Sequence, residues 1–93
     1  MTATPDLLAD LVEGQTYQLD TAPDGTGGIR WDLFRDSRTD GQLAWRQIAT
    51  HTTRVPTGGY RSPALGWLRS MDLDPGAMDL VLILPDGLER LRP

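Results

Sequence analysis

The sequence predicts an α+β domain in which an antiparallel sheet of about four strands carries two helices on one face. Apolar and polar residues alternate in the segments 17–20 and 29–34, which are separated by turn sequences rich in Gly and Asp. Two other segments repeat apolar residues at helical spacing, and residues 80–84 form one continuous apolar run. With 93 residues the chain has room for one core, so residues 1–93 are expected to form a single domain.

The first expected element is a short helix between Thr4 and Gly14. Thr4 is a suitable N-cap, Pro5 fits the first helical position, and Gly14 can end the helix. The apolar residues that share one face of this segment are Leu7, Leu8, Leu11 and Val12. A helix of two to three turns must pack on the rest of the protein to be stable.

Three strands are then expected to form an antiparallel meander. The first contains Tyr17 and Leu19 and ends in the turn sequence "APDGTGG". The second covers Ile29 to Phe34, and the third is the segment "LAWRQIATHTT", reached through the sequence Asp-Gly at 40–41. The aspartates of these turns lack the ligand spacing of an EF-hand, so turn chemistry accounts for them.

The second and third strands can pair in two registers. A two-residue loop at 40–41 places Leu33 opposite Ile48 and leaves Trp45 on the other face of the sheet. A longer loop places Leu33 opposite Trp45 and turns Ile48 outward. Because a slip of one residue exchanges the faces, the two arrangements cannot coexist without a bulge. We favour the first register, with a bulge near Arg46.

The second helix is expected to run from Ser62, as its N-cap, to about Leu73, with Pro63 at its first position. Its apolar face consists of Ala64, Trp67, Leu68 and Met71. The run "LVLIL" from Leu80 to Leu84 then predicts a buried strand, followed by a "PDG" turn. The tail "LERLRP" fits either a short edge strand or a last half-turn of helix.

The region from Tyr17 to Met71 resembles the YegP-like family of small bacterial proteins. The matching pieces are "YQLDTAPDG", "IRWDLF", "QIATHTT" and "GGYRSPALGWLRS". The resemblance implies a meander followed by a helix, a homodimer, and no defined activity. This chain departs from the family pattern in its N-terminal helix, in the insertion "RVPT" before Gly-Gly, and in its C-terminal apolar strand.

Composition excludes several classes of function. The chain has no cysteine and a single histidine, His51, which excludes disulfides, thiolate chemistry and metal sites built from several histidines. The net charge of −4 argues against a nucleic acid as partner, because such binding neutralises phosphates with basic side chains. No signal peptide and no membrane-spanning run is recognisable. We expect a cytoplasmic protein without metal or cofactor.

We expect a non-catalytic protein–protein interaction module that binds a second copy of itself or another protein. In either register of the second hairpin, an apolar side chain reaches the sheet face away from the helices, with Phe34 beside it. The candidate partner-binding residues are Phe34, Trp45, Arg30 and Arg46. One specific form of this hypothesis is a phage or mobile-element inhibitor of a host protein.

The alternative is an enzyme or binding protein for a phosphorylated small molecule. Backbone N–H groups of a glycine loop at a helix N-terminus can bind an anion, and arginines can add charge-assisted hydrogen bonds. The candidate residues are Arg54, Gly58, Gly59, Arg61 and Ser62, with His51 and Tyr60 nearby for acid–base chemistry. The same Gly-Gly and Ser-Pro sequences are also what a plain turn into a helix requires, and no Walker-type lysine follows them.

Overall fold

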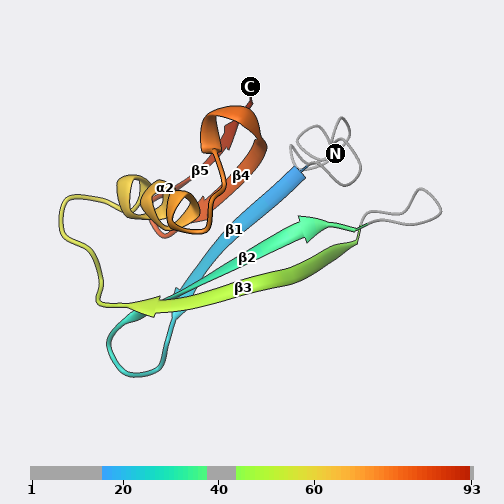
Figure 1. The fold of residues 1–93 in the computed structure, drawn as a ribbon. Helices are drawn as coiled ribbons and strands as arrows, with labels where there is room; N and C mark the ends of the chain where they lie inside the picture. The colour runs from blue at the N-terminus through green and yellow to red at the C-terminus, as the bar shows by residue number, and fades with distance from the viewer. Residues whose placement is uncertain (1–15, 38–43, 93) are drawn as a thin grey trace, which may run out of the picture.

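The computed structural model of the chain describes residues 16–37 and 44–92 (Figure 1). The predicted helix between Thr4 and Gly14 and the turn at 40–41 lie outside the described residues. The elements are β1 (Thr16–Pro23), β2 (Ile29–Asp36), β3 (Trp45–Thr53), α2 (Arg61–Ser70), the 3-10 turn η1 (Pro75–Ala77), β4 (Asp79–Leu84) and β5 (Gly87–Leu91).

The predicted sheet of about four antiparallel strands with two helices is wrong. The five strands form one mixed sheet in the order β3-β2-β1-β4-β5, in which β1 and β4 are parallel. Among the described residues there is one α-helix, α2, together with η1. The meander β1-β2-β3 is confirmed, because both of its pairs are antiparallel.

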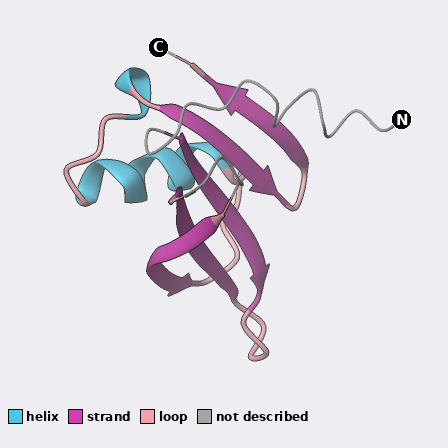
Figure 2. Ribbon diagram, turned by 90° about the vertical axis from the view of Figure 1, so that its right-hand side faces the viewer, coloured by secondary structure: helices cyan, strands magenta, loops and turns pink. Residues whose placement is uncertain are grey.

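The parallel pair follows from the crossover through α2. In a three-stranded meander β3 runs in the same direction as β1, and α2 then returns the chain across the sheet before β4 begins (Figure 2). Strand β4 therefore enters in the direction of β1 and pairs with it from Thr16–Asp79 to Asp20–Ile83. A crossover connection of this kind is what parallel neighbours need.

The C-terminal tail, left open between strand and helix by the sequence, is the fifth strand. A two-residue turn at Pro85-Asp86 reverses the chain, and β5 pairs antiparallel with β4 from Leu84–Gly87 to Leu80–Leu91. Proline at the second position of such a turn is favoured because its φ angle is already suitable.

The core lies between α2 and one face of the sheet. Leu33, Leu19 and Leu82 stand side by side on β2, β1 and β4, and all three are fully buried. The buried residues of α2 that pack on them are Ala64, Leu65 and Leu68. Full burial of one such leucine stabilises the fold by about 1.5–3 kcal/mol.

Helix α2 begins two residues earlier than predicted and ends sooner. Tyr60 is its N-cap, not Ser62, and its last residue is Ser70 instead of Leu73. No side chain caps the first turn, so Ser62 does not serve as predicted. Pro63 takes the third helical position, which costs no hydrogen bond because the first four N–H groups of a helix have no partner within it.

The β2–β3 pair shows which register the sequence adopts. Phe34 lies opposite Gln47 and Asp36 opposite Trp45, which is the register of a two-residue loop. The register shifts between Leu33 and Phe34, so Leu33 lies opposite Ala49 and not Ile48, and the extra residue of the bulge is Ile48, two positions beyond Arg46. The shift places the small Ala49 over the core and leaves Ile48 48% exposed.

Candidate functional site

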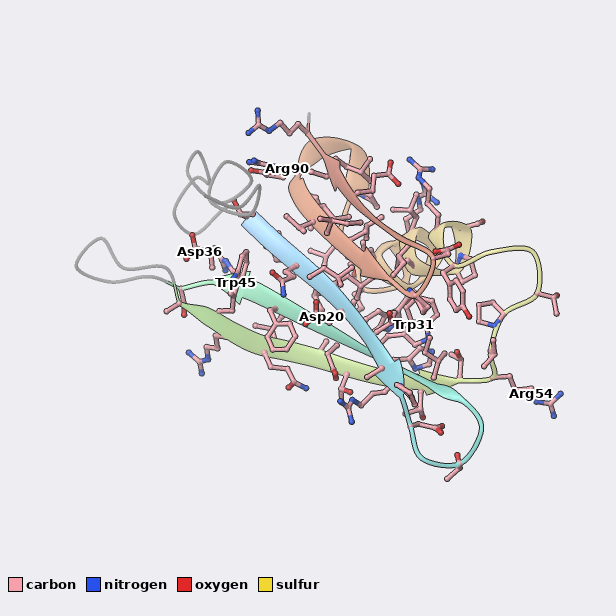
Figure 3. The ribbon with its side chains drawn as sticks, turned by 180° about the vertical axis from the view of Figure 1, so that it is seen from behind. Asp20, Trp31, Asp36, Trp45, Arg54 and Arg90 are labelled. Atoms are coloured by element: carbon pink, nitrogen blue, oxygen red, sulfur yellow. The ribbon has the colours of Figure 1, made fainter. Side chains whose placement is uncertain are left out.

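One face of the strands β1–β3 is turned away from α2, and we call it the helix-free face. Side chains alternate between faces along each strand, and cross-strand partners share a face. Since Leu19 and Leu33 face α2, Phe34 and its partner Gln47 belong to the helix-free face, as does Trp45. Figure 3 shows Trp45 near the start of β3 and Asp20 over the middle of the three strands.

Two of the predicted partner-binding residues are therefore close neighbours. Trp45 lies diagonally across the ladder from Phe34, because their direct partners are Asp36 and Gln47. Diagonal neighbours are about 7–8 Å apart, within reach of aromatic side chains. Both rings are half-buried, so each keeps apolar surface that a partner could cover.

The two predicted arginines are not brought together. Arg30 lies on the helix-free face, where its Nε donates to Asp32 over 2.8 Å. Arg46 is the direct partner of Arg35, whose guanidinium stacks on Tyr17 at 5.9 Å on the side of α2. Arg46 shares a face with Arg35 and therefore points to the side of α2. The bulge follows Arg46 along β3, so it does not bring Arg46 onto the helix-free face.

A polar network that the sequence analysis missed occupies the centre of the helix-free face. Asp32 is only 7% exposed and accepts hydrogen bonds from three side chains. Besides Arg30, these are Thr50 over 2.7 Å and Gln47 over 3.4 Å. A buried carboxylate is tolerated only when it is paired and hydrogen-bonded in this way. The sequence does not reveal these contacts, because Thr50 and Gln47 approach Asp32 only through the register of β2 and β3.

Asp20 is the unusual member of this network. It is the direct cross-strand partner of Asp32, and like charges placed opposite each other are unfavourable. Its described polar contact is with Gln18, whose Nε2 donates to Oδ1 over 3.0 Å. Burial raises the pKa of Asp20, the Gln18 hydrogen bond opposes this, and the charge of Asp32 adds to the rise. Asp20 is thus a half-buried carboxylate without a cation among the described residues.

This environment predicts a pH dependence of stability. A carboxyl whose pKa is raised by folding binds its proton more tightly in the folded than in the unfolded chain. Stability from this group is therefore present at low pH and is lost as the pH rises through the folded pKa of Asp20. We expect Asp20→Asn to raise the free energy of unfolding at pH 7. The gain should disappear below the unfolded value near 3.8.

The measurement is urea unfolding of dilute protein at pH 7 and pH 3. Asp24→Asn is the matched control, because its pKa is lowered by hydrogen bonds from the backbone and side chain of Thr26. That substitution should destabilise the protein at pH 7. If both variants shift stability in the same direction at pH 7, the environment assigned to Asp20 is wrong.

The predicted anion-binding residues are spread over two places. Gly58 and Gly59 have φ angles of +86° and +107°, so the loop before α2 needs glycine at both. Arg61 is drawn away from this loop, because its Nε donates to Glu89 over 2.9 Å. Arg54 lies in a separate polar groove beside Asp24 and Thr26.

His51 also has a structural contact. Its ring stacks on Trp67 of α2, with the centroids 5.4 Å apart and an angle of 21° between the planes. The imidazole therefore packs the exposed strand β3 against the helix. Ser62, the remaining predicted ligand, is exposed in the first turn of α2.

Comparison of the chain with protein-family models, with curated proteins and with solved structures finds no match. The resemblance to the YegP-like family therefore stays a prediction. Within the described residues, no helix is both long enough and apolar enough to cross a membrane.

Proposed function

We propose that this chain is a non-catalytic protein–protein interaction module that forms a homodimer through its helix-free face. The observation that carries the proposal is the composition of this face. Phe34 and Trp45 lie together at one end, and Asp20 lies near the middle without a cation among the described residues. Trp is favoured as an anchor in protein interfaces, and aromatic residues are enriched there.

A second copy suits this face because a two-fold interface must complement itself. The face carries both a carboxylate that lacks a cation among the described residues, on Asp20, and a guanidinium, on Arg30, whose Nε is paired with Asp32 but whose side chain is 48% exposed. Across a two-fold axis, Arg30 of each copy would approach Asp20 of the other. Phe34 and Trp45 would then bury apolar surface of the partner copy. The Arg30–Asp20 pairs would fix how the two copies are aligned on each other.

The test is light scattering coupled to size exclusion over a range of protein concentrations. We expect a dimer for the wild-type protein, and a folded monomer for Phe34→Asp and for Trp45→Asp, because either change buries a carboxylate in the interface. Val55→Asp is the matched control. Val55 is an exposed apolar residue, 48% accessible, in the loop after β3. It should leave the dimer intact.

A more conservative variant tests the proposed pairing of Asp20 with Arg30 of the other copy. Asp20→Asn removes the carboxylate and keeps the acceptor of the Gln18 hydrogen bond, so we expect it to weaken association by roughly two- to fivefold. A wild-type protein that stays monomeric at all concentrations would reject the proposal. So would Asp variants at 34 and 45 that dimerise as the control does.

The alternative proposal, a phosphorylated ligand at Gly58-Gly59, has less in its favour. It needs Arg54 and Arg61 on one anion, whereas Arg61 is engaged by Glu89 and Arg54 lies beside Asp24.

A further inference from the structure

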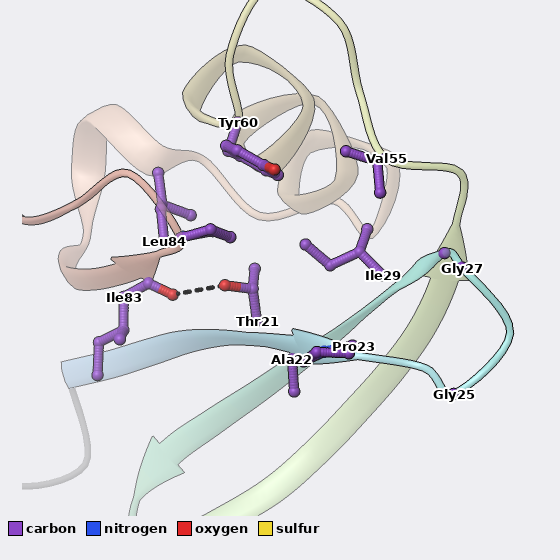
Figure 4. A pocket seen from close by; sticks show the side chains of 12 residues that line it. Thr21, Ala22, Pro23, Gly25, Gly27, Ile29, Val55, Tyr60, Ile83 and Leu84 are labelled. Atoms are coloured by element: carbon purple, nitrogen blue, oxygen red, sulfur yellow. Dashed lines mark hydrogen bonds between the residues drawn. The ribbon is translucent and has the colours of Figure 1, made fainter.

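A cavity of about 580 Å³ opens at the end of the sheet where β1 and β4 finish (Figure 4). It lies away from Phe34 and Trp45 and belongs to neither site considered above. Twelve residues line it, among them Thr21, Ile29, Val55, Tyr60 and Leu84. Pockets that hold small molecules commonly measure about 300–1,000 Å³.

The topology explains why the sheet splits here. The parallel strands β1 and β4 pair as far as Asp20–Ile83, and the Thr21 hydroxyl donates to the Ile83 carbonyl over 3.0 Å as their last link. Beyond it β1 turns towards β2 on one side, and β4 turns towards β5 on the other. The carboxyl ends of parallel neighbours whose connections leave in opposite directions are where open sheets form crevices.

The lining determines which class of molecule fits. None of the twelve lining residues carries a charge, and most are aliphatic, glycine or proline. One of the large apolar residues that remain exposed, Val55, stands in this lining at 48% accessibility, and Ile83 contributes its backbone carbonyl. An ionised ligand would lose its hydration here without a counter-charge. The cavity therefore suits an uncharged, mainly apolar molecule.

Tyr60 supplies the polar group. Figure 4 shows its ring over the cavity, with the side chains of Val55 and Leu84 on either side of it. Its ring also lies 6.4 Å from that of Trp31, which holds it against the core. Among the described residues its hydroxyl has no hydrogen-bond partner, and the Thr21 hydroxyl is already used by Ile83. A phenol beside an apolar cavity can donate to a ligand acceptor.

We propose that this cavity binds a small, uncharged, mainly apolar molecule that carries one hydrogen-bond acceptor for the Tyr60 hydroxyl. This proposal is independent of dimerisation.

The first test uses two fluorescent probes with the same ring system. N-phenyl-1-naphthylamine is neutral, and 8-anilino-1-naphthalenesulfonate adds a sulfonate. We expect the neutral probe to bind the full chain with a rise in emission, and the anionic one to bind at least tenfold more weakly in 0.5 M salt, where the protein's net charge is screened. Equal binding of the two probes, or none of the neutral one, would overturn the proposal.

Paired variants then locate the site. Val55→Asp places a carboxylate in the lining and should weaken the neutral probe about tenfold or more. Ile48→Asp is the matched control, because Ile48 is also 48% exposed but lies on the β3 bulge outside the cavity. It should leave binding unchanged. Equal losses in both variants would place the probe elsewhere.

The role of Tyr60 is tested with a third probe, the neutral ketone 6-propionyl-2-dimethylaminonaphthalene. Tyr60→Phe keeps the ring and removes only the hydroxyl. We expect it to weaken the ketone roughly three- to tenfold and to leave N-phenyl-1-naphthylamine unchanged, since only the ketone offers a carbonyl acceptor. The same change for both probes would show that the hydroxyl is not the recognition group.

Discussion

Replacement of Trp31 by alanine is expected to lower the free energy of unfolding by about 3–5 kcal/mol, the cost of emptying a large core position. Trp31 is 2% exposed and fully surrounded by the core between β2 and α2. Its indole N–H also donates to the Thr53 hydroxyl over 2.8 Å, so the variant loses a hydrogen bond in addition to apolar contact. A domain of this size has a stability of about 5–15 kcal/mol, so the variant would be barely folded.

Urea unfolding measures this effect, with an unchanged slope as evidence that only stability has altered. Trp45→Ala is the matched control, because Trp45 is half-buried on the helix-free face. In dilute protein its loss should be less than half that of Trp31→Ala. Comparable losses at the two positions would contradict the placement of the core on one side of the sheet.

Arg90→Ala is expected to destabilise the protein by a similar amount, about 3–5 kcal/mol. Two parallel hydrogen bonds join Arg90 on β5 to Asp79 on β4, one of 3.0 Å from Nε and one of 2.7 Å from Nη2. The exposed fractions of the two side chains are only 11% and 12%. Removal of the guanidinium leaves a buried carboxylate whose remaining described side-chain partner is Thr16, at 3.2 Å.

Two further variants test whether the loss of stability in Arg90→Ala comes from the buried, unpaired charge of Asp79. Arg61→Ala breaks an exposed ion pair with Glu89, whose side chains are 56% and 39% accessible, and should cost less than about 1 kcal/mol. Replacement of both buried partners, Asp79→Leu with Arg90→Met, should recover most of the lost stability, because no uncompensated charge remains. A double variant as unstable as Arg90→Ala alone would show that the penalty is not electrostatic.

The sequence was sufficient for elements whose pattern is local. Three elements have the type that their periodicity predicts. The alternating segment around Trp31 is a strand, the segment with an apolar face at helical spacing is α2, and the run from Leu80 to Leu84 is a strand that contributes to the core. The two-residue loop register was recoverable as well, since Phe34 pairs with Gln47 as that loop requires. These features depend on residues a few positions apart, so local spacing determines them.

The errors concern contacts between distant segments. An apolar run such as residues 80–84 fits a parallel or an antiparallel partner equally well, so its place beside β1 depends on the crossover through α2. The Asp20–Asp32 pair was missed for the same reason, because two separate polar positions reveal no contact until the register is known. The position of the bulge decided where Arg46 points, and nothing near Ile48 marks a bulge in the sequence.

Protection of single introduced thiols tests the dimer through the helix-free face most directly, since the chain has no cysteine of its own. Gln47→Cys places a thiol on the helix-free face, and Gly66→Cys places one on the exposed side of α2, where an added side chain meets nothing within 4 Å. Iodoacetamide labelling of both is followed at low and at high protein concentration. We predict that Cys at 47 becomes protected as the protein associates, while Cys at 66 reacts at a constant rate. Protection at 66 alone, or at neither position, would contradict the proposed interface.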